Sequence, residues 1–335
     1  MTLTLEHLAA RPLSGDQMAG AMERIMGGAA PAAEVGAFLR ALASRGETAE
    51  EIAAAVQSLR RYAVVLPLSK PLPLCDTCGT GGDGQGTFNV STLTALAAAA
   101  CGIRVSKHGN RAASSRCGSA DVLEALGLNL SATPPQIARS VEEIGFGFCF
   151  APTFHPAMKA VAEVRKQLGI RTIFNLVGPL ANPAPLTFQL VGVSDGRLLE
   201  PMAKALQALG IRHGMVVHGA DGLDEVTTTG PTQALEVRPS GVTPLALAPE
   251  RYGIPAASLE ALRGGDMEAN AQIARTVLGG APSPQRDVVA FNAGCAVYVA
   301  DRAPTIQQGI AMATAALESG RALRILERAI ELSRA

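Results

Sequence analysis

The sequence predicts an α/β protein with a mostly parallel central sheet flanked by helices, plus a small all-helical domain. Residues 1–66 show apolar residues at helical spacing and no strand pattern. From residue 74, short β-like runs alternate with helical ones, which is typical of a parallel sheet covered by helices on both faces. With 335 residues, 48% of them hydrophobic, the chain can form one large domain and a smaller one.

The N-terminal region is predicted to be a small helical domain over residues 1–70. Ser14-x-x-Gln17 and Thr48-x-x-Glu51 are capping-box patterns, in which side chains satisfy the free backbone groups at a helix start. The region ends in a proline-rich segment, which we interpret as a hinge or linker.

The α/β region follows from residue 74. Strands are expected at 74–77, 103–106, 147–151, 188–193 and 213–218, and helices at 92–101, 118–126, 134–144, 197–209 and from 266 to the end. The stretch of about 155–182 has the pattern of two helices with no strand between them, which interrupts the β/α alternation. We expect these inserted helices to join the N-terminal domain in space, so that the large α/β domain consists of residues 71–154 and 183–335.

The stretch CDTCGTGGDGQGTFNVST, residues 75–92, fits more than one kind of site. Gly79-x-Gly81-x-x-Gly84 matches the dinucleotide-binding pattern, but that site needs an acidic residue about 20 positions later to hold the ribose. No Asp or Glu occurs between Asp83 and Asp121. The loop also lacks the Gly-Lys-Ser/Thr of a nucleotide-triphosphate loop. A plain tight turn is the remaining alternative to an anion site.

A second loop of similar composition favours the anion site. Residues 107–115, KHGNRAASS, follow the next predicted strand, and Gly118-Ser119 opens the next helix. Consecutive strand-to-helix loops lie at the same edge of a parallel sheet, where ligands bind in such folds. Glycine-rich loops and helix N-termini present backbone N–H groups to anions. We therefore predict an anion site here, for more than one phosphate.

Cys75-x-x-Cys78 invites a zinc or redox interpretation, which the context does not support. No second ligand pair occurs at zinc-like spacing, and the pair falls on a strand rather than at a helix start. We interpret these cysteines as buried thiols in a reduced, cytoplasmic protein. The N-terminus lacks the features of a signal peptide, and no apolar run reaches the length of about 20 residues that spans a membrane. The 29 basic and 29 acidic residues argue against a general nucleic-acid binder.

Taken together, the motifs of residues 79–225 resemble those of the anthranilate phosphoribosyltransferase family. The matching stretches are GTGGD at 79–83, TFNVST at 87–92, KHGNR at 107–111, GSADVLEAL at 118–126, HPAMK at 155–159, RTIFNL at 171–176, GPL at 178–180 and HGADGLDE at 218–225. The resemblance implies transfer of the phosphoribosyl group of phosphoribosyl pyrophosphate (PRPP) to anthranilate, giving N-(5-phosphoribosyl)anthranilate and pyrophosphate, the second step of tryptophan biosynthesis. It also implies a nucleoside phosphorylase/phosphoribosyltransferase-type fold, a bound Mg²⁺ and a homodimer formed through the helical domain.

The resemblance assigns roles residue by residue, and it names no single catalytic residue. The residues implied to bind PRPP are Gly79, Gly82, Asp83, Thr87, Asn89, Val90, Ser91, Thr92, Lys107, Ser115 and Ser119. Those implied to bind anthranilate are Gly79, Asn110, His155, Arg165 and Gly178. Those implied to hold the metal are Ser91, Asp224 and Glu225.

Some alternatives stay open at this point. Asp83 can accept hydrogen bonds from ribose hydroxyls or from loop amides. Arg165 can instead be a surface arginine on an amphipathic helix, and the Asp224-Glu225 pair a solvated turn. For the whole chain, the other candidates are a nucleoside phosphorylase-like enzyme and a non-catalytic nucleic-acid-binding paralogue. The first is disfavoured by the acidic pair, and the second by the absence of a basic surplus.

Overall fold

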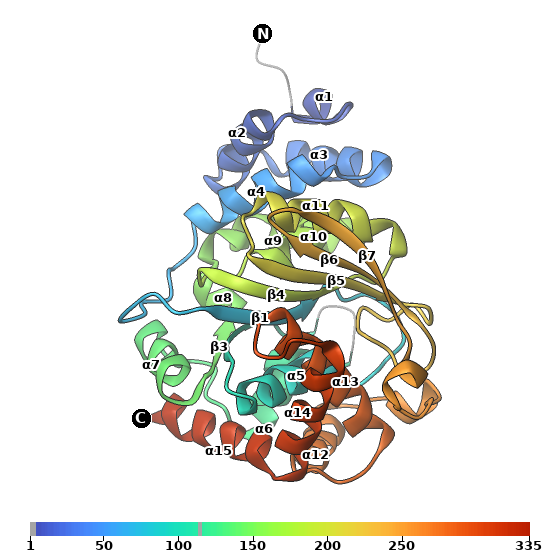
Figure 1. Cartoon of the computed structure of the whole chain (residues 1–335). Coiled ribbons are helices and arrows are strands. Elements are labelled where there is room, and N and C mark those ends of the chain that lie inside the picture. Colours follow the sequence, from blue (N-terminus) through green and yellow to red (C-terminus); the bar gives the residue numbers. More distant parts are fainter. Residues whose placement is uncertain (1–4, 113–115) are drawn as a thin grey trace.

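The computed structural model describes residues 5–112 and 116–335, and it begins with a bundle of four helices (Figure 1). These are α1 (Leu5–Ala9), α2 (Gly15–Met26), α3 (Ala32–Arg45) and α4 (Ala49–Arg61). Both predicted capping boxes are present: Ser14 and Gln17 close the start of α2, and Thr48 and Glu51 close the start of α4. Local sequence therefore correctly predicted where α2 and α4 begin.

A seven-stranded sheet forms the centre of the molecule, in the order β3-β2-β1-β4-β5-β6-β7. Its strands are β1 (Leu74–Gly79), β2 (Arg104–Gly109), β3 (Phe146–Phe150), β4 (Leu186–Gly192), β5 (His213–Gly219), β6 (Thr232–Arg238) and β7 (Gly241–Leu247). The first five are parallel, and β6 and β7 are antiparallel. This confirms the predicted fold class of a mostly parallel sheet with helices and a small helical unit.

Two features of the sheet differ from the prediction. The sequence analysis did not find the hairpin of β6 and β7, whose strands are only partly buried and therefore carry a weak apolar alternation. It also ended the second strand at residue 106, whereas β2 continues to Gly109. The extension arises because Lys107 and His108 pair with Phe148 and Cys149 of β3.

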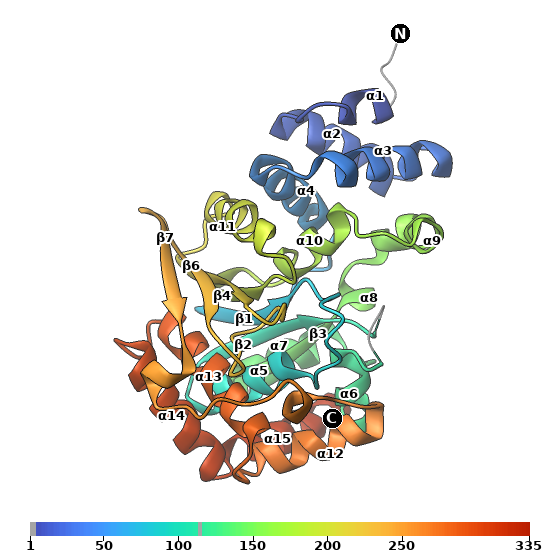
Figure 2. The same ribbon diagram turned by 90° about the vertical axis from the view of Figure 1, so that its right-hand side faces the viewer.

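Helices cover both faces of the sheet and bury two large cores, and a third, smaller cluster includes Leu74 of β1 and Cys149 of β3 (Figures 1 and 2). One face is covered by α5 (Val90–Ala100), α6 (Ser119–Leu126), α12 (Met267–Leu278), α13 (Pro284–Val299), α14 (Ile306–Glu318) and α15 (Arg321–Arg334), and the other by α11 (Leu199–Ala208) and the helices above it. Alternate residues of one strand belong to different cores: Met215 and Val217 of β5 lie in the first, and Val216 in the second.

The predicted insertion contains α9 (Lys159–Leu168) and α10 (Ile173–Leu180), which follow α7 (Pro134–Ile144), α8 (Ala151–Phe154) and η1 (Pro156–Met158). Helix α9 contacts α2 and α3, and α10 contacts α3 and α4. Figure 2 shows both helices between the N-terminal bundle and the sheet. The division of the chain into domains stays a prediction. No helix of the described residues is long and apolar enough to cross a membrane.

Candidate active site

The glycine loop, residues 80–89, leaves the carboxyl end of β1 and enters α5. Four glycines in it adopt a positive φ, Gly81, Gly82, Gly84 and Gly86, a conformation that other residues rarely take. Gly79 is required for a different reason: a Cβ there would overlap the Asp224 carboxylate. The backbone N–H of Gly81 also donates to Asp224 Oδ2 at 2.7 Å. The loop therefore lies directly against the acidic pair at 224–225, although the two segments are more than 130 residues apart in the chain.

Lys107 is a buried cation beneath the loop. Its side chain points from β2, and the residue is only 2% exposed. Nζ donates to the carbonyl of Thr77 at 2.6 Å and to Ser91 Oγ at 3.4 Å. A buried charge is costly unless it is paired. Burial raises the pKa of both Asp76 and Glu225, and the positive charge of Lys107 opposes that rise, so these carboxyls are the acidic partners of the buried cation.

The acidic pair is held by backbone N–H groups of the first loop. Glu225 Oε1 accepts from the Ser91 N–H at 3.0 Å, in the first turn of α5. Burial, and then the charge of Asp224, raise the pKa of Glu225 well above its usual value. Burial, and then the charge of Asp83, raise the pKa of Asp224 to about 6. The pair lies half-buried in a bend against the loop, with raised pKa values, so it is not a fully solvated turn.

The carboxylates fit a hard cation that other ligands complete. Burial, and then the repulsion among Asp83, Asp224 and Glu225, raise the pKa of the latter two, and a cation would relieve this repulsion. Among residues 5–112 and 116–335, no three His, Cys, Asp or Glu side chains are arranged to hold a metal ion by themselves. Mg²⁺ needs no such cage, because it binds through one or two carboxylates together with phosphate oxygens and water. The oxygen donors present therefore fit Mg²⁺.

The structure gives the Asp83 carboxylate a hydrogen-bond partner, which the sequence left open. Its Oδ1 accepts from the N–H of Gln85 at 3.1 Å, so it contacts a loop amide. Asp221, to which the sequence analysis gave no role, accepts from the hydroxyls of Thr227 and Thr229 and braces its own turn.

The other residues implied to bind PRPP lie around the same two loops. Asn89 is the N-cap of α5, Val90 and Thr92 are buried in its first turn, and Thr87 pairs with Arg263. The hydroxyl of Thr92 is buried and makes no hydrogen bond. In the second loop, Ser119 begins α6, and its Oγ donates to the Asn110 carbonyl at 3.2 Å. Ser115 lies outside the described residues.

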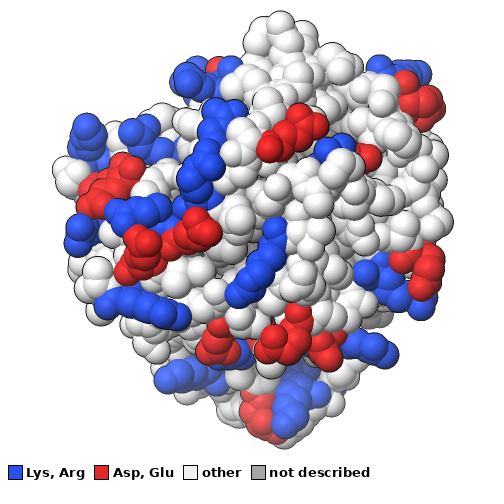
Figure 3. Space-filling model, turned by 90° about the horizontal axis from the view of Figure 1, so that it is seen from below, with Lys and Arg blue, Asp and Glu red and all other residues white. Residues whose placement is uncertain are grey.

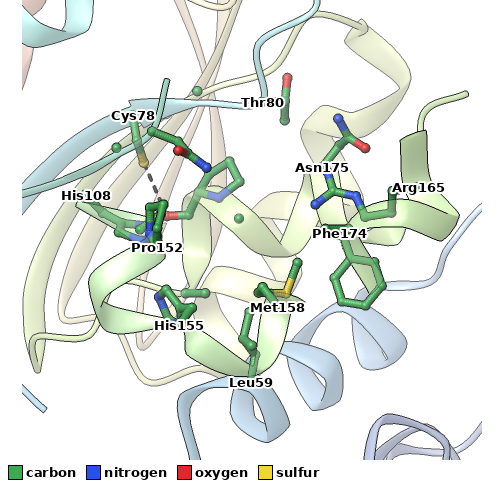
Figure 4. A pocket seen from close by; sticks show the side chains of 18 of the residues that line it. Leu59, Cys78, Thr80, His108, Pro152, His155, Met158, Arg165, Phe174 and Asn175 are labelled. Carbon is green, nitrogen blue, oxygen red and sulfur yellow. Dashed lines mark hydrogen bonds between the residues drawn. The ribbon is translucent and has the colours of Figure 1, made fainter. Parts of the chain in front are cut away.

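A pocket of about 420 Å³ adjoins the loops and lies between β1, β2 and the inserted helices (Figure 4). All five residues implied to bind anthranilate line it: Gly79, Asn110, His155, Arg165 and Gly178. The sequence analysis did not identify several other lining residues, including Thr80, Phe174 and Asn175. They lie within the quoted motifs GTGGD at 79–83 and RTIFNL at 171–176, but the motifs do not show that they face a common pocket, and only the folding of α10 beside β1 brings them there.

Arg165 and a histidine pair lie on different sides of this pocket. Figure 4 shows Arg165 beside Asn175 and Phe174, with its guanidinium 5.5 Å from the Phe174 ring centre. Arg165 lies half-buried on α9 at the pocket wall, and burial lowers its pKa. The guanidinium therefore offers a charged group to a ligand carboxylate.

His108 and His155 contact each other edge to face, with ring centres 5.0 Å apart. Burial lowers the pKa of His108 to about 3, and the neighbouring His155 contributes. Burial likewise lowers the pKa of His155 to about 4. Both rings are therefore neutral near pH 7, and the pocket wall they form is apolar in character. His108, the neighbour of Lys107 in β2, thus lines the pocket together with His155.

The cysteines agree with the expectation of buried thiols. All six are buried and none forms a disulfide, and burial raises the pKa of Cys75 and Cys78 in β1. On the face shown in Figure 3, basic and acidic side chains are interspersed.

Comparison with family models gives two matches that together cover most of the chain. Residues 5–63 match the glycosyl transferase family helical bundle domain, and residues 72–323 match the glycosyl transferase family a/b domain. Among curated proteins, the chain is 48% identical over 323 residues to the anthranilate phosphoribosyltransferase of Symbiobacterium thermophilum, covering 96% of this chain and 94% of that protein.

Solved structures give the same result. The chain is similar to the crystal structure of anthranilate phosphoribosyltransferase from Thermus thermophilus, with a TM-score of 0.94, 46% identity, and 99% of this chain and 100% of that chain covered. The Saccharomyces cerevisiae enzyme in complex with PRPP and Mg matches with a TM-score of 0.86 and 29% identity, covering 99% of this chain and 94% of that one. The same yeast enzyme has also been solved in complex with 4-fluoroanthranilate.

Proposed function

Because the chain belongs to the anthranilate phosphoribosyltransferase family, we propose that its two adjoining regions hold the two substrates of that reaction. The enzyme transfers the phosphoribosyl group of PRPP to anthranilate and releases pyrophosphate. The position of Gly79 supports the assignment of one substrate to each region. Gly79 lines the pocket and also lies against the Asp224 carboxylate. The two binding regions therefore meet at one residue.

PRPP binds at the sheet edge formed by the two loops. The glycine loop and the first turn of α5 offer backbone N–H groups to phosphate oxygens, and the hydroxyls of Ser91 and Thr92 lie in the same turn. Lys107 provides a fixed positive charge beneath them. Asn89, Thr87 and Ser119 surround these groups, and Ser115 is assigned with them from the family motif alone.

Asp224, Glu225 and Ser91 are the residues that would hold Mg²⁺ together with the pyrophosphate. Bound there, the ion neutralises the pyrophosphate and makes it a better leaving group. The yeast relative solved with PRPP and Mg supports this assignment. So do the raised pKa values of the half-buried carboxylates, to which burial and then their mutual repulsion contribute, because a divalent cation would relieve the repulsion.

Anthranilate binds in the 420 Å³ pocket, with its carboxylate toward Arg165. A guanidinium grips a carboxylate through two parallel hydrogen bonds. Asn110, His155 and Gly178 form other parts of the wall. The neutral imidazoles of His108 and His155 pack against the aromatic ring without adding charge.

The chain's own groups act by positioning and electrostatics. The aromatic amine is already a usable nucleophile, so no strong base is required to activate it. Displacement at the ribose carbon has oxocarbenium character, and the rate comes from holding amine and carbon in line while the phosphates are held at the loops. Closure of the helical unit, residues 1–70 and about 155–182, over residues 71–154 and 183–335 brings the two regions together.

We also infer a homodimer formed through the helical domain and a cytoplasmic location. Of the large hydrophobic residues exposed in the described chain, Tyr62, Val64, Val65 and Ile170 lie at the ends of α4 and α9, on the helical side. Six buried cysteines, none of them in a disulfide, agree with a reducing compartment. Light scattering at several protein concentrations tests the dimer.

The function is tested by incubating the purified chain with anthranilate, PRPP and Mg²⁺ and detecting N-(5-phosphoribosyl)anthranilate by chromatography. Product is expected only when all three are present, and chelation of the metal abolishes it. The second candidate, phosphorolysis of a nucleoside, is tested with uridine or thymidine and phosphate, where no base release is expected. Base release at a comparable rate, without anthranilate transfer, would overturn the assignment.

A further inference from the structure

A segment distant in sequence, residues 262–270, lies directly behind the glycine loop. The N–H of Phe88 donates to the carbonyl of Leu262 at 3.2 Å, and the N–H of Gly264 donates to the carbonyl of Gly86 at 2.9 Å. The two segments therefore run together as a short antiparallel pair, and the loop is supported along its second half.

The approach between these segments is close enough to require glycine. A Cβ on Gly264 would lie 2.8 Å from the Cα of Phe88 and 2.8 Å from Asn270 Oδ1, closer than side-chain carbons pack. The segment thus brings Asn270, in the first turn of α12, against the end of the glycine loop. Asn270 is 3% exposed, and a buried amide is expected to be hydrogen-bonded at both ends.

Asn270 and Asn89 form a relay of hydrogen bonds that joins three segments. The N–H of Gly265 donates to Asn270 Oδ1 at 2.8 Å, and Asn270 Nδ2 donates to Asn89 Oδ1 at 3.0 Å. Asn89 Nδ2 in turn donates to the carbonyl of Cys117 at 3.0 Å, in the second loop. Each amide has one acceptor and one donor engaged, so its orientation is determined by its partners.

The Asn89 side chain does not cap α5, although its position at the N-cap suggests that it would. An asparagine at a helix N-cap commonly accepts a hydrogen bond from an N–H of the first turn. Asn89 is the N-cap of α5, yet its side chain makes no such bond. Its carbonyl oxygen is engaged by Asn270 instead, and the amide links the two loops.

We propose that Asn270 is a positioning residue for PRPP, which holds the Asn89 amide away from the helix cap and links the glycine loop to the second loop. The proposal rests on the proposed function, which assigns PRPP to these loops. Asn270 lies behind Asn89 and acts through it. No sequence motif identified Asn270, because its partner is 181 residues away.

The test compares Asn270→Asp with Asn129→Asp. The first change keeps the acceptor for Gly265 but removes the donor to Asn89, because a carboxylate has no N–H. Asn129 makes the same pair of bonds elsewhere: it accepts from Ser131 N–H and donates to the Ser333 carbonyl at 2.9 Å. Asn129→Asp therefore removes one amide donor at a position far from the two loops and serves as the control.

For Asn270→Asp, the KM for PRPP is expected to rise roughly three- to tenfold, the effect of one lost hydrogen bond, with the KM for anthranilate unchanged. Asn129→Asp leaves both KM values unchanged. If Asn270→Asp does not fold, Asn270→Ala, which introduces no charge, replaces it. An unchanged KM for PRPP in both Asn270 variants would overturn the proposal.

A second measurement needs no substrate. Amide hydrogen exchange of residues 86–92 is expected to be faster in Asn270→Asp than in Asn129→Asp, since the Asn89 side chain is released. Equal exchange would show that Asn270 does not hold the loop. This result separates the two proposals: a chain that does not use PRPP refutes the function, whereas equal exchange refutes the relay.

Discussion

The backbone N–H of Ser91 donates to Glu225 Oε1 at 3.0 Å, although 134 residues separate them. A carboxylate thereby occupies the first turn of the helix whose N-terminus we assign to phosphate. Two anions sharing one helix end repel each other, so the arrangement favours binding of PRPP together with a cation rather than alone.

The stability of the protein should depend on the protonation of Asp224. Burial raises its pKa to about 6 from 3.8, so the folded protein holds this proton more tightly than the unfolded chain. Its contribution to stability is present below the unfolded pKa and is lost as the pH rises through about 6. Asp224→Asn is therefore expected to raise the free energy of unfolding at about pH 8 by on the order of 2 kcal/mol, and by little below about pH 4.

Denaturant unfolding at several pH values measures this difference. The matched control is Asp195→Asn. The hydrogen bond from Arg197 lowers the pKa of the Asp195 carboxyl, so its ionised form stabilises the folded protein, and removing the charge should not raise the free energy of unfolding. Asp224→Asn should also lose Mg²⁺-dependent activity, whereas Asp195→Asn keeps it. A variant at 224 that is less stable at about pH 8 would contradict the prediction.

Gly79→Ala should disable the site without changing any polar group. The added methyl would overlap the Asp224 carboxylate, so either β1 or the acidic pair must move. We expect the melting temperature to fall, at a cost of roughly 1–3 kcal/mol for overpacking, together with loss of activity. Calorimetry and the transfer assay measure both effects.

Gly20→Ala provides the matched control for that change. Gly20 lies inside α2, and a Cβ added there would meet no other atom within 4 Å. This substitution should stabilise the protein by roughly 0.5–1 kcal/mol and leave activity unchanged. Full activity of Gly79→Ala would mean that the contact with Asp224 is not needed.

Arg165→Ala should weaken anthranilate binding selectively. A charge-assisted hydrogen bond contributes about 1.5–3 kcal/mol, so the KM for anthranilate should rise roughly 10- to 100-fold with the KM for PRPP unchanged. Lys166→Ala removes a neighbouring exposed cation and should have no effect. Equal effects of the two variants, measured by steady-state kinetics, would argue for general electrostatics instead of a specific contact.

His108 and His155 should not titrate near neutral pH. Their pKa values are lowered to about 3 and about 4, chiefly by burial, so their NMR shifts should stay constant between about pH 5.5 and 8. Each contributes stability that is present above the unfolded pKa of about 6.5 and is lost as the pH falls through the folded pKa. His155→Asn should therefore reduce the acid sensitivity of unfolding. A titration near pH 6.5 would show that the rings are solvated.

Local patterns predicted much of the fold. The capping boxes of α2 and α4 and the bounds of α7 at 134–144 agree with the structure, because these features depend on residues a few positions apart. The hairpin of β6 and β7 was missed, because its strands are held by pairing along the sheet rather than by a strong apolar alternation.

The sequence by itself determined that two glycine-rich loops lie at one sheet edge, since consecutive parallel strands direct their loops to the same side. Only the tertiary structure decided what surrounds them. It brought Glu225 to Ser91, Lys107 beneath the loop within β2, and Asn270 to Asn89. These contacts join residues that share no local pattern, and they form because the packing of the whole sheet and its helices brings distant segments together.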